Sequence, residues 1–368
     1  MKAFPTGASR AAIARLRAGA PLIANPSSAN DLVMRTLAQH GLVQGGASTA
    51  PNPQAAGSLQ QMMARFRPQE TTASEPALPE GARFSEDQFS CAAGSRRYRT
   101  YIPASAQSGA TGMIVMLHGC TQTPEDFAAG TGMNALAETH GFIVVYPHQS
   151  RGENAQSCWN WFRRGDQRRD LGEPAILAGL ARKLATEHFV PSGKTFVAGL
   201  SAGAAMAVIL GETYPDVFAA VGAHSGLPGG AAKDVPSAFA AMAGNGGDPT
   251  PLAGTTPMPT IILHGTADTT VCPVNGEQIA RRVLALGPRQ TLQSEDRGQA
   301  GGRSYRRTVT EDSAGAPLVE HWEIEGLGHA WSGGSARGSY TDAQGPDAST
   351  AMVRFFFAAS DARNPADT

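Results

Sequence analysis

A glycine-flanked serine between a predicted strand and a predicted helix constrains the fold of this chain more than any other feature. The pentapeptide GLSAG (199–203) follows the short, apolar, β-branched run 194–200 and precedes the alanine-rich run 202–212. The first run predicts a buried strand and the second a helix. Side chains two residues to either side of a serine on so sharp a turn would collide with it, which accounts for both glycines. The pattern is typical of a nucleophile elbow, with Ser201 as the nucleophile.

From residue 89 onward, predicted strands alternate with predicted helices. Strands are expected at 96–102, as an edge strand, and at 113–117, 142–146, 194–200, 218–223, 260–263, 303–310 and 318–324. Helices are expected at 125–138, 173–188, 202–212, 277–286 and 348–359. Such alternation indicates a mostly parallel central sheet flanked by helices on both faces. The predicted fold class is therefore α/β, and the elbow favours the α/β-hydrolase fold.

Residues 1–85 differ in composition from the rest of the chain. They are rich in Ala, Gly, Pro, Ser and Thr, and predict a linker-rich N-terminal extension ahead of a catalytic domain at 86–362. Short helices are expected within the extension at 8–17, 30–40 and 58–66. Two interpretations remain open: a flexible extension with transient helices, or a segment that docks on the main domain or on a second subunit.

The charge and hydropathy of the chain exclude several classes of partner. Its 30 Lys and Arg residues balance 31 Asp and Glu residues, so we expect neither a nucleic-acid surface nor a polybasic membrane contact. No apolar run approaches the roughly eighteen residues that a membrane-spanning helix needs. The apolar piece 18–24 near the N-terminus is short and contains Pro21, which makes it a poor secretory signal.

The four cysteines are Cys91, Cys120, Cys158 and Cys272, and none of them belongs to a C-x-x-C pair. They predict neither a disulfide scaffold nor a metal site, and no cofactor is expected. Two bridges would favour an oxidising compartment, whereas four free thiols would suit the cytosol. Localisation therefore stays open, with the poor secretory signal favouring the cytoplasm and an extracellular location as the alternative.

Asp268 and His329 follow Ser201 in the chain order that a catalytic triad takes in the α/β-hydrolase fold. Asp268 lies just past the predicted strand 260–263, and His329 lies in a glycine-rich loop after the predicted strand 318–324. We expect Asp268 to hold His329 in the tautomer that accepts the serine proton. Taken singly, Asp268 could instead be a turn or helix-cap residue and His329 a surface histidine.

The segment LHGC (117–120) follows the first buried core strand, where this fold has its second oxyanion donor. We expect the backbone N–H groups of Cys120 and Ala202 to point at the oxygen that becomes negative in the tetrahedral intermediate. The Cys120 side chain is not needed for this, and a structural role, with a bridge to Cys158 as one option, stays open. His118 and His264 each end an apolar strand and are interpreted as structural histidines that line the site.

Aromatic residues cluster near the expected site. Trp159 and Trp161 lie in the segment CWNWF (158–162), and Trp331 follows His329 by two residues. Together with His118 they are candidate substrate-binding residues, and core packing is the alternative. The long, glycine-rich segment 226–259 is expected to shape the mouth of a pocket or a cap.

The chain resembles the esterases of the polyhydroxybutyrate depolymerase family, a branch of the α/β hydrolases that also includes feruloyl and acetylxylan esterases. The matching stretches, which cover most of residues 90–360, are LHGCTQTPEDF, YPHQS, CWNWF, GEPAILAGL, VAGLSAGAAMA, HSGLP, HGTADTTVCPVNG and GLGHAWSGG. The resemblance implies Ser201, Asp268 and His329 as the triad and a carboxylic ester as the substrate. It does not specify a polymer, a hydroxyacid oligomer or a phenolic ester. Secreted polymer-degrading members carry a signal peptide and often a substrate-binding domain, and neither is expected here.

The predicted function is that of a serine carboxylic-ester hydrolase of the polyhydroxybutyrate depolymerase type, acting through an acyl-enzyme. A feruloyl or acetylxylan type of esterase is the alternative within the family. From other classes, a catalytically silent polyester-binding protein on the same fold and an acyl transferase stay open. The oligomeric state is not predicted.

Overall fold

A ten-stranded sheet forms the centre of the fold, with its strands in the order β1-β2-β4-β3-β5-β6-β7-β10-β9-β8. The computed structural model describes residues 78–107, 109–246 and 256–363, so the three helices expected before residue 67 lie outside the described residues. The strands of this sheet are β1 (Arg83–Cys91), β2 (Gly94–Ile102), β3 (Met113–Leu117), β4 (Ile143–Pro147), β5 (Thr195–Leu200), β6 (Val221–His224), β7 (Thr260–Gly265), β8 (Thr291–Ala300), β9 (Arg303–Asp312) and β10 (Pro317–Ile324).

The six central strands are parallel, and antiparallel pairs extend the sheet at both ends. β3, β4 and β5 are buried along their whole length. Parallel strands buried on both faces read as continuous apolar runs, which is why the sequence located them well. The predicted α/β class with a mostly parallel sheet is confirmed.

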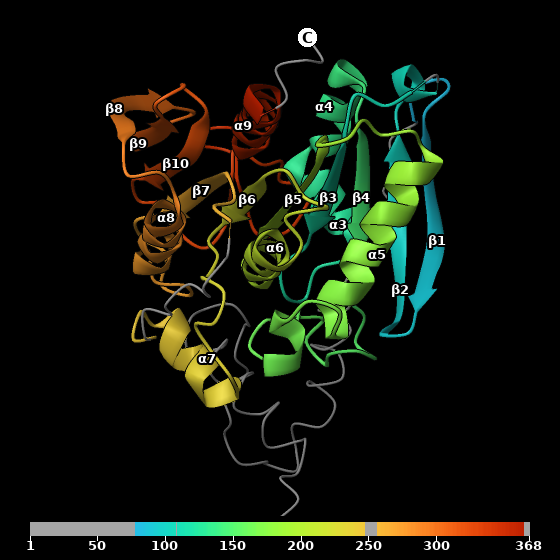
Figure 1. Ribbon diagram of the computed structural model, residues 1–368, viewed down its shortest axis with the longest axis horizontal. Helices are drawn as coiled ribbons and strands as arrows, with labels where there is room; N and C mark the ends of the chain where they lie inside the picture. Colours follow the sequence, from blue (N-terminus) through green and yellow to red (C-terminus); the bar gives the residue numbers. More distant parts are fainter. Residues whose placement is uncertain (1–77, 108, 247–255, 364–368) are drawn as a thin grey trace, which may run out of the picture. The chain divides into compact units, whose positions relative to one another are not determined.

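Helices cover both faces of the sheet (Figure 1). They are α3 (Pro124–Thr131), α4 (Met133–His140), α5 (Gly172–Glu187), α6 (Ala202–Thr213), α7 (Val235–Met242), α8 (Val274–Leu286) and α9 (Ala348–Arg363). Alternate residues of one strand point to opposite faces, so Val115 of β3 packs in the core under α5, α6 and α8, whereas Ile114 packs in the core under α3, α4 and α9. Two apolar cores thus hold the central strands in a fixed position.

The outer strands of the sheet were harder to predict than the central ones. The strand expected at 96–102 is not an edge strand, because β1 pairs with β2 on its outer side. β1 begins at Arg83, before the expected boundary at residue 86, and β8 was missed altogether. Both are mostly exposed, so neither shows an apolar period of two. Charged residues lie along both, including Glu86 and Asp87 in β1 and Glu295 to Arg297 in β8.

Two helix predictions were also corrected. The single helix expected at 125–138 is two helices, because Gly132 adopts a left-handed φ of 64° that ends α3 and begins α4. Within the segment 226–259, α7 was not predicted, although Asp234 caps it by accepting a hydrogen bond from Ser237 N at 2.9 Å. A capping aspartate three residues before a serine, with Pro236 in the first turn, was the signal that could have found it.

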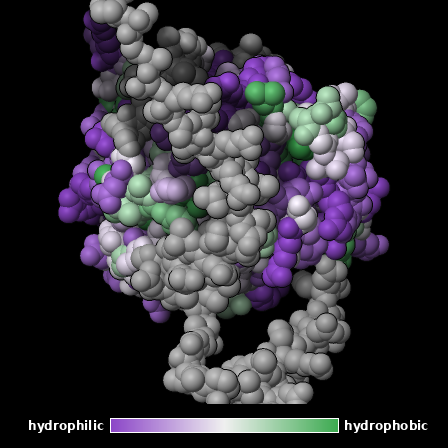
Figure 2. Space-filling view, turned by 90° about the horizontal axis from the view of Figure 1, so that it is seen from below, coloured by the Kyte–Doolittle hydropathy of each residue, from purple (hydrophilic) through white to green (hydrophobic). Residues whose placement is uncertain are grey.

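α7 follows β6 in the chain and lies below the central sheet in Figure 1. Figure 2 shows the molecule from this side, where the coloured surface is mainly hydrophilic and hydrophobic residues gather in a few small groups. None of the helices in the described part of the chain combines the length and the apolar character that a membrane crossing needs.

Candidate active site

Ser201 lies on the sharp turn between β5 and α6. Its φ of 58° and ψ of −119° are a strained conformation for a residue with a side chain. The turn is held by a hydrogen bond of 2.9 Å from Ser201 N to the carbonyl oxygen of His224 at the end of β6. Ala202 is buried behind the turn, whereas Ser201 is partly exposed. The predicted elbow geometry is therefore present.

The two flanking glycines let a neighbouring loop approach the elbow. A Cβ atom at Gly203 would lie 2.0 Å from the carbonyl oxygen of Leu117 and 2.7 Å from that of His118. A Cβ atom at Gly199 would lie 2.4 Å from the carbonyl carbon of Gly203. Real Cβ atoms do not approach backbone so closely. Glycine at both positions therefore keeps the loop after β3 in contact with the elbow.

Asp268 and His329 are hydrogen-bonded to each other. His329 Nδ1 lies 2.8 Å from Asp268 Oδ2, and the other carboxylate oxygen accepts from Thr270 N and Val271 N at 2.9 Å each. Burial acts to raise the pKa of Asp268, yet the hydrogen bond and charge of His329, with the contributions of His264 and Val271, hold it below its ordinary value. An ionised Asp268 requires the proton of the neutral imidazole on Nδ1, which leaves Nε2 free as a base.

The loops that carry this pair are fastened together by their backbones. Ala267 N donates to the carbonyl oxygen of Leu327 at 3.0 Å, and Thr266 N donates to that of Ile324 at 2.9 Å. A Cβ atom at Gly265 would lie 2.1 Å from the Leu327 carbonyl oxygen, so glycine is again required for the close approach. The loop after β10 is thereby fixed against the loop after β7, its neighbour in the sheet.

His224, which was not singled out from the sequence, links the elbow to the histidine loop. Its carbonyl oxygen accepts from Ser201 N, and its Nε2 accepts from Ser332 N at 3.0 Å. Burial lowers the pKa of His224 to about 3, so the imidazole is neutral and can accept. In the described residues the Ser201 hydroxyl has no hydrogen bond to His329, and such contacts often close only when substrate binds. The serine–histidine contact therefore stays a prediction.

Two backbone amides at the site are without an acceptor. Among the described residues neither Cys120 N nor Ala202 N donates a hydrogen bond. The amides on either side of Cys120 are occupied, since Gly119 N donates to Gln122 Oε1 at 2.9 Å and Thr121 N to the Gln156 carbonyl oxygen at 2.8 Å. Two unpaired donors of this kind fit the predicted oxyanion hole.

The structure shows the cysteine pairing that the sequence left open. Cys120 and Cys158 form a disulfide with a Cα–Cα distance of 4.3 Å, while Cys91 and Cys272 are free. The bridge joins the loop after β3 to the loop after β4. It therefore fastens the residue whose amide is the proposed oxyanion donor.

The four candidate substrate-binding side chains are buried. His118, Trp159 and Trp331 have no exposed surface and Trp161 is 5% exposed. Trp159 Nε1 donates to the His118 carbonyl oxygen, and Trp331 Nε1 donates to Ser349 Oγ. Trp159 and Trp331 thus pack against the loops of the site, and contact of these four residues with substrate stays a prediction.

No group of three or more His, Cys, Asp or Glu side chains within the described ranges is arranged to hold a metal ion. His264, the second histidine at a strand end, is buried and bonded through Nε2 to the Val271 carbonyl oxygen at 2.9 Å. Its Nε2 also lies 3.6 Å from Asp268 Oδ2. This agrees with a structural histidine beside the acid.

The chain matches a family model described as esterase PHB depolymerase over residues 96–299, which is more than half of its length. This range contains Ser201 and Asp268 but ends before His329, whose assignment rests on its hydrogen bond to Asp268. The chain is 37% identical over 242 residues to poly(3-hydroxyalkanoate) depolymerase C of Paucimonas lemoignei, covering 62% of this chain and 57% of that protein.

Two further relatives are esterases of acetylated xylan by name. A probable acetylxylan esterase A of Aspergillus flavus is 32% identical over 200 residues, which are 50% of this chain and 64% of that protein. The solved acetyl xylan esterase from Aspergillus awamori superposes with a TM-score of 0.56 at 20% identity and covers 74% of this chain and 99% of its own. The structural match confirms the α/β-hydrolase fold. The chain spans just over half the length of the Paucimonas protein.

Proposed function

Since the chain belongs to the esterase PHB depolymerase family, we propose that it is a serine hydrolase of carboxylic esters. One observation above all supports this activity. A buried, ionised Asp268 orients His329 at the same sheet edge as the strained Ser201 turn, which is the arrangement of a base prepared to activate a serine.

In the proposed reaction, Ser201 Oγ attacks the ester carbonyl carbon while His329 Nε2 takes the hydroxyl proton. The carbonyl oxygen becomes an oxyanion and accepts hydrogen bonds from Cys120 N and Ala202 N. Collapse of this tetrahedral intermediate breaks the bond to the alcohol oxygen, which receives the proton from His329. Water then attacks the acyl-enzyme by the same path, and the acid leaves with Ser201 restored.

The substrate that the relatives favour is an ester of a hydroxyalkanoate, as polymer or oligomer, because the 37% identity to a named poly(3-hydroxyalkanoate) depolymerase extends over 242 residues. An acetylated polysaccharide is the second candidate, favoured by the 32% identity to a named acetylxylan esterase. Hydrolysis rates for hydroxybutyrate oligomers, acetylated xylan, methyl ferulate and short-chain nitrophenyl esters would rank these classes.

The serine is tested by Ser201→Ala with p-nitrophenyl butyrate as the substrate. We expect kcat to fall by at least about 10⁴-fold, because no other nucleophile is positioned at the elbow. Wild-type rates in the variant would contradict the proposal. Failure of the native protein to react with a fluorophosphonate would favour a silent polyester-binding protein, and acyl transfer to an added alcohol in preference to water would indicate a transferase.

A further inference from the structure

The loop after β3 that contains residues 118–120, called the His118 loop below, carries the Cys120 amide. Two buried hydrogen bonds to His118 fix its position. Trp159 Nε1 donates to the His118 carbonyl oxygen at 3.0 Å, and Gln149 N donates to His118 Nε2 at 3.1 Å. Burial lowers the pKa of His118 to about 4, so its neutral ring accepts at Nε2 and donates from Nδ1 to the Gly119 carbonyl oxygen. The peptides on the N-terminal side of Cys120 are thus oriented by residues of the segment after β4.

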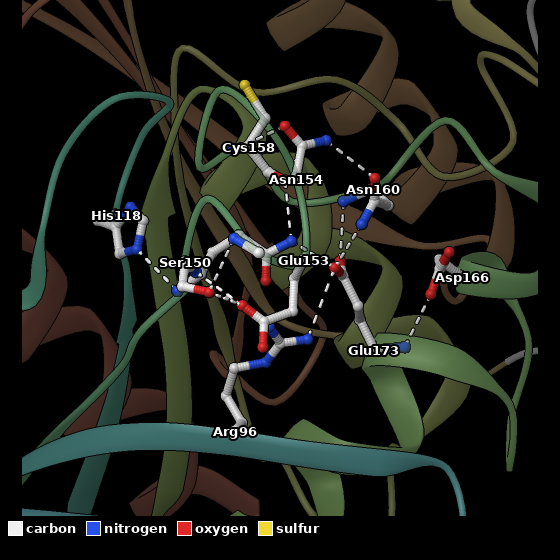
Figure 3. A network of polar contacts seen from close by, with 11 residues as sticks. Arg96, His118, Ser150, Glu153, Asn154, Cys158, Asn160, Asp166 and Glu173 are labelled. Carbon is white, nitrogen blue, oxygen red and sulfur yellow. Dashed lines mark hydrogen bonds and ion pairs between the residues drawn. The ribbon is translucent and has the colours of Figure 1, made fainter. Parts of the chain in front are cut away.

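Glu173, in the first turn of α5, joins both parts of that segment. Its side chain accepts hydrogen bonds from Gln149 Nε2 at 2.6 Å, Asn160 N at 2.8 Å and Asn160 Nδ2 at 2.7 Å. Arg96 NH2 lies 3.7 Å from the same carboxylate, and Asn160 and Arg96 approach it from different sides (Figure 3). Every one of these partners is a donor, which fits an ionised carboxylate.

Arg96 connects the carboxylate to Trp159. The guanidinium carbon lies 5.7 Å from the centroid of the Trp159 ring, a cation–π distance, and Arg96 is 3% exposed. Glu173 therefore acts on the His118 loop by two routes: through Gln149 to the imidazole, and through Asn160 and Arg96 to the neighbouring Trp159. At its own backbone, Glu173 N donates to Asp166 Oδ1 at 2.8 Å, which fixes the start of α5.

Burial of the Glu173 carboxylate has an energetic cost. Glu173 is 5% exposed, and burial raises its pKa because the charged form loses water. Apolar side chains of the same volume often stabilise a fold as well as a buried ion pair does, and in some proteins a buried charged network serves to select one geometry. The geometry specified here is that of the loop carrying the candidate oxyanion donor.

We propose that Glu173 is a positioning residue for the oxyanion hole. Its carboxylate sets the His118 and Gly119 peptides through Gln149, Asn160 and Trp159, and these peptides aim the Cys120 amide. The Cys120–Cys158 disulfide fastens the same loop by a side chain, and the network adds the orientation of its backbone. The inference rests on the proposed hydrolase function.

The test is Glu173→Gln, which keeps the shape but replaces one acceptor oxygen by a donor facing other donors. With p-nitrophenyl butyrate, we expect kcat per fluorophosphonate-titrated site to fall by about 10- to 100-fold and KM to change by less than about twofold. The affinity for an alkylboronic acid, whose tetrahedral adduct has an oxygen in the hole, should fall by a similar factor.

The matched control is Glu320→Gln. Glu320 is also a buried glutamate that accepts from a tryptophan, Trp322 Nε1, and from an arginine, Arg354, but it lies on β10 and contacts no residue of the His118 loop. Both variants should unfold at lower urea concentration than the wild type, and only Glu173→Gln should change kcat per titrated site. Equal effects of the two variants on kcat, or none from Glu173→Gln, would overturn the proposal.

If Glu173→Gln does not fold, Trp159→Phe supplies the test, because it removes the Nε1–H donor to the His118 carbonyl oxygen and keeps an aromatic ring at this buried position. Its kcat should fall by about tenfold with KM nearly unchanged, and an unchanged kcat would overturn the proposal. The proposed function has a separate failure: it fails if the wild type does not hydrolyse esters or if Ser201→Ala does. Activity that needs Ser201 and is indifferent to Glu173 and Trp159 refutes the positioning role alone.

Discussion

Asp268 uses both carboxylate oxygens for different tasks, and this division decides how it can be replaced. Oδ1 accepts from the Thr270 and Val271 amides, and Oδ2 accepts from His329. In Asp268→Asn the two amides will keep the remaining carbonyl oxygen, so the NH2 group will face His329 Nδ1. That imidazole can then accept only with its proton on Nε2, which is the wrong tautomer for a base.

We therefore expect Asp268→Asn to lower kcat by about 10⁴-fold at neutral pH with little loss of stability. The measurement is kcat with p-nitrophenyl butyrate, beside the free energy of unfolding in urea. Asp234→Asn is the control, because asparagine caps a helix as well as aspartate does and α7 should keep its start. A kcat for Asp268→Asn within tenfold of the wild type would mean that Asp268 does not orient the base.

At the residue scale, the sequence predicts roles for residues that have a characteristic chain order and local motif. Ser201, Asp268 and His329 were predicted in this way, and the structure brings the last two into contact. His224 and Glu173 were not found, because each acts through contacts with residues that are distant in the chain, such as Ser332 and Gln149. A lone buried histidine or glutamate has no local pattern that separates it from an ordinary core or helix residue.

At the element scale, the packing of the β3 loop on the elbow helix leaves no room for a methyl group at Gly203. Gly203→Ala should lower the free energy of unfolding by about 1–3 kcal/mol, since the new Cβ must displace the Leu117 or His118 carbonyl. Movement of that loop also moves the Cys120 amide, so kcat per titrated site should fall by about 10²-fold.

Gly165→Ala is the comparison for this change, because a Cβ atom there meets no heavy atom within 4 Å. It should alter the free energy of unfolding by no more than about 0.5 kcal/mol, as an open surface site does. Urea denaturation of both variants gives the comparison directly. If Gly203→Ala proves as stable and as active as Gly165→Ala, the loop and the elbow are not in the close contact described.

Helices and strands were predictable from the sequence where their buried residues form an apolar run or an apolar period. The six parallel strands are apolar runs, and each was located to within a few residues, as were the helices between them other than α7. β1 and β8 are exposed and polar, and they form because they pair with β2 and β9, not because of their own side chains. The left-handed φ of Gly132 divides one expected helix into two. This break was not predicted, because a glycine within a helical pattern gives no sign of its φ in the sequence.

At the scale of the whole molecule, buried neutral histidines make stability depend on pH. Burial lowers the pKa of His118 and His321 to about 4 and that of His224 to about 3, whereas a histidine in the unfolded chain has a pKa of about 6.5. Between these values the unfolded chain binds more protons than the folded one. Stability is therefore complete above about pH 6.5 and is lost as the pH falls toward 4.

The expected result is a urea midpoint that falls steadily between pH 7 and 5. If the unfolded chain binds three more protons than the folded one, the free energy of unfolding falls by at most about 4 kcal/mol for each unit by which the pH is lowered. The buried carboxyls of Glu173 and Glu212, whose pKa values burial raises, oppose this trend in its lower part. His321→Gln should reduce the slope of the unfolding free energy against pH by the contribution of about one proton. A urea midpoint that does not change between pH 7 and 5 would show that these histidines are not held neutral.

The two outer strands of the sheet have a consequence for how copies of the protein meet. In the described residues β1 and β8 each pair on one side only, and unpaired strand edges can template the addition of strands from other molecules. Both strands are mostly exposed and carry charged side chains, among them Glu86, Asp87, Glu295 and Asp296. A second chain that paired with either edge strand would have to desolvate these charged side chains, which costs free energy. The charges therefore disfavour edge-to-edge aggregation, and the sheet can stay open at both ends without growing into a fibre.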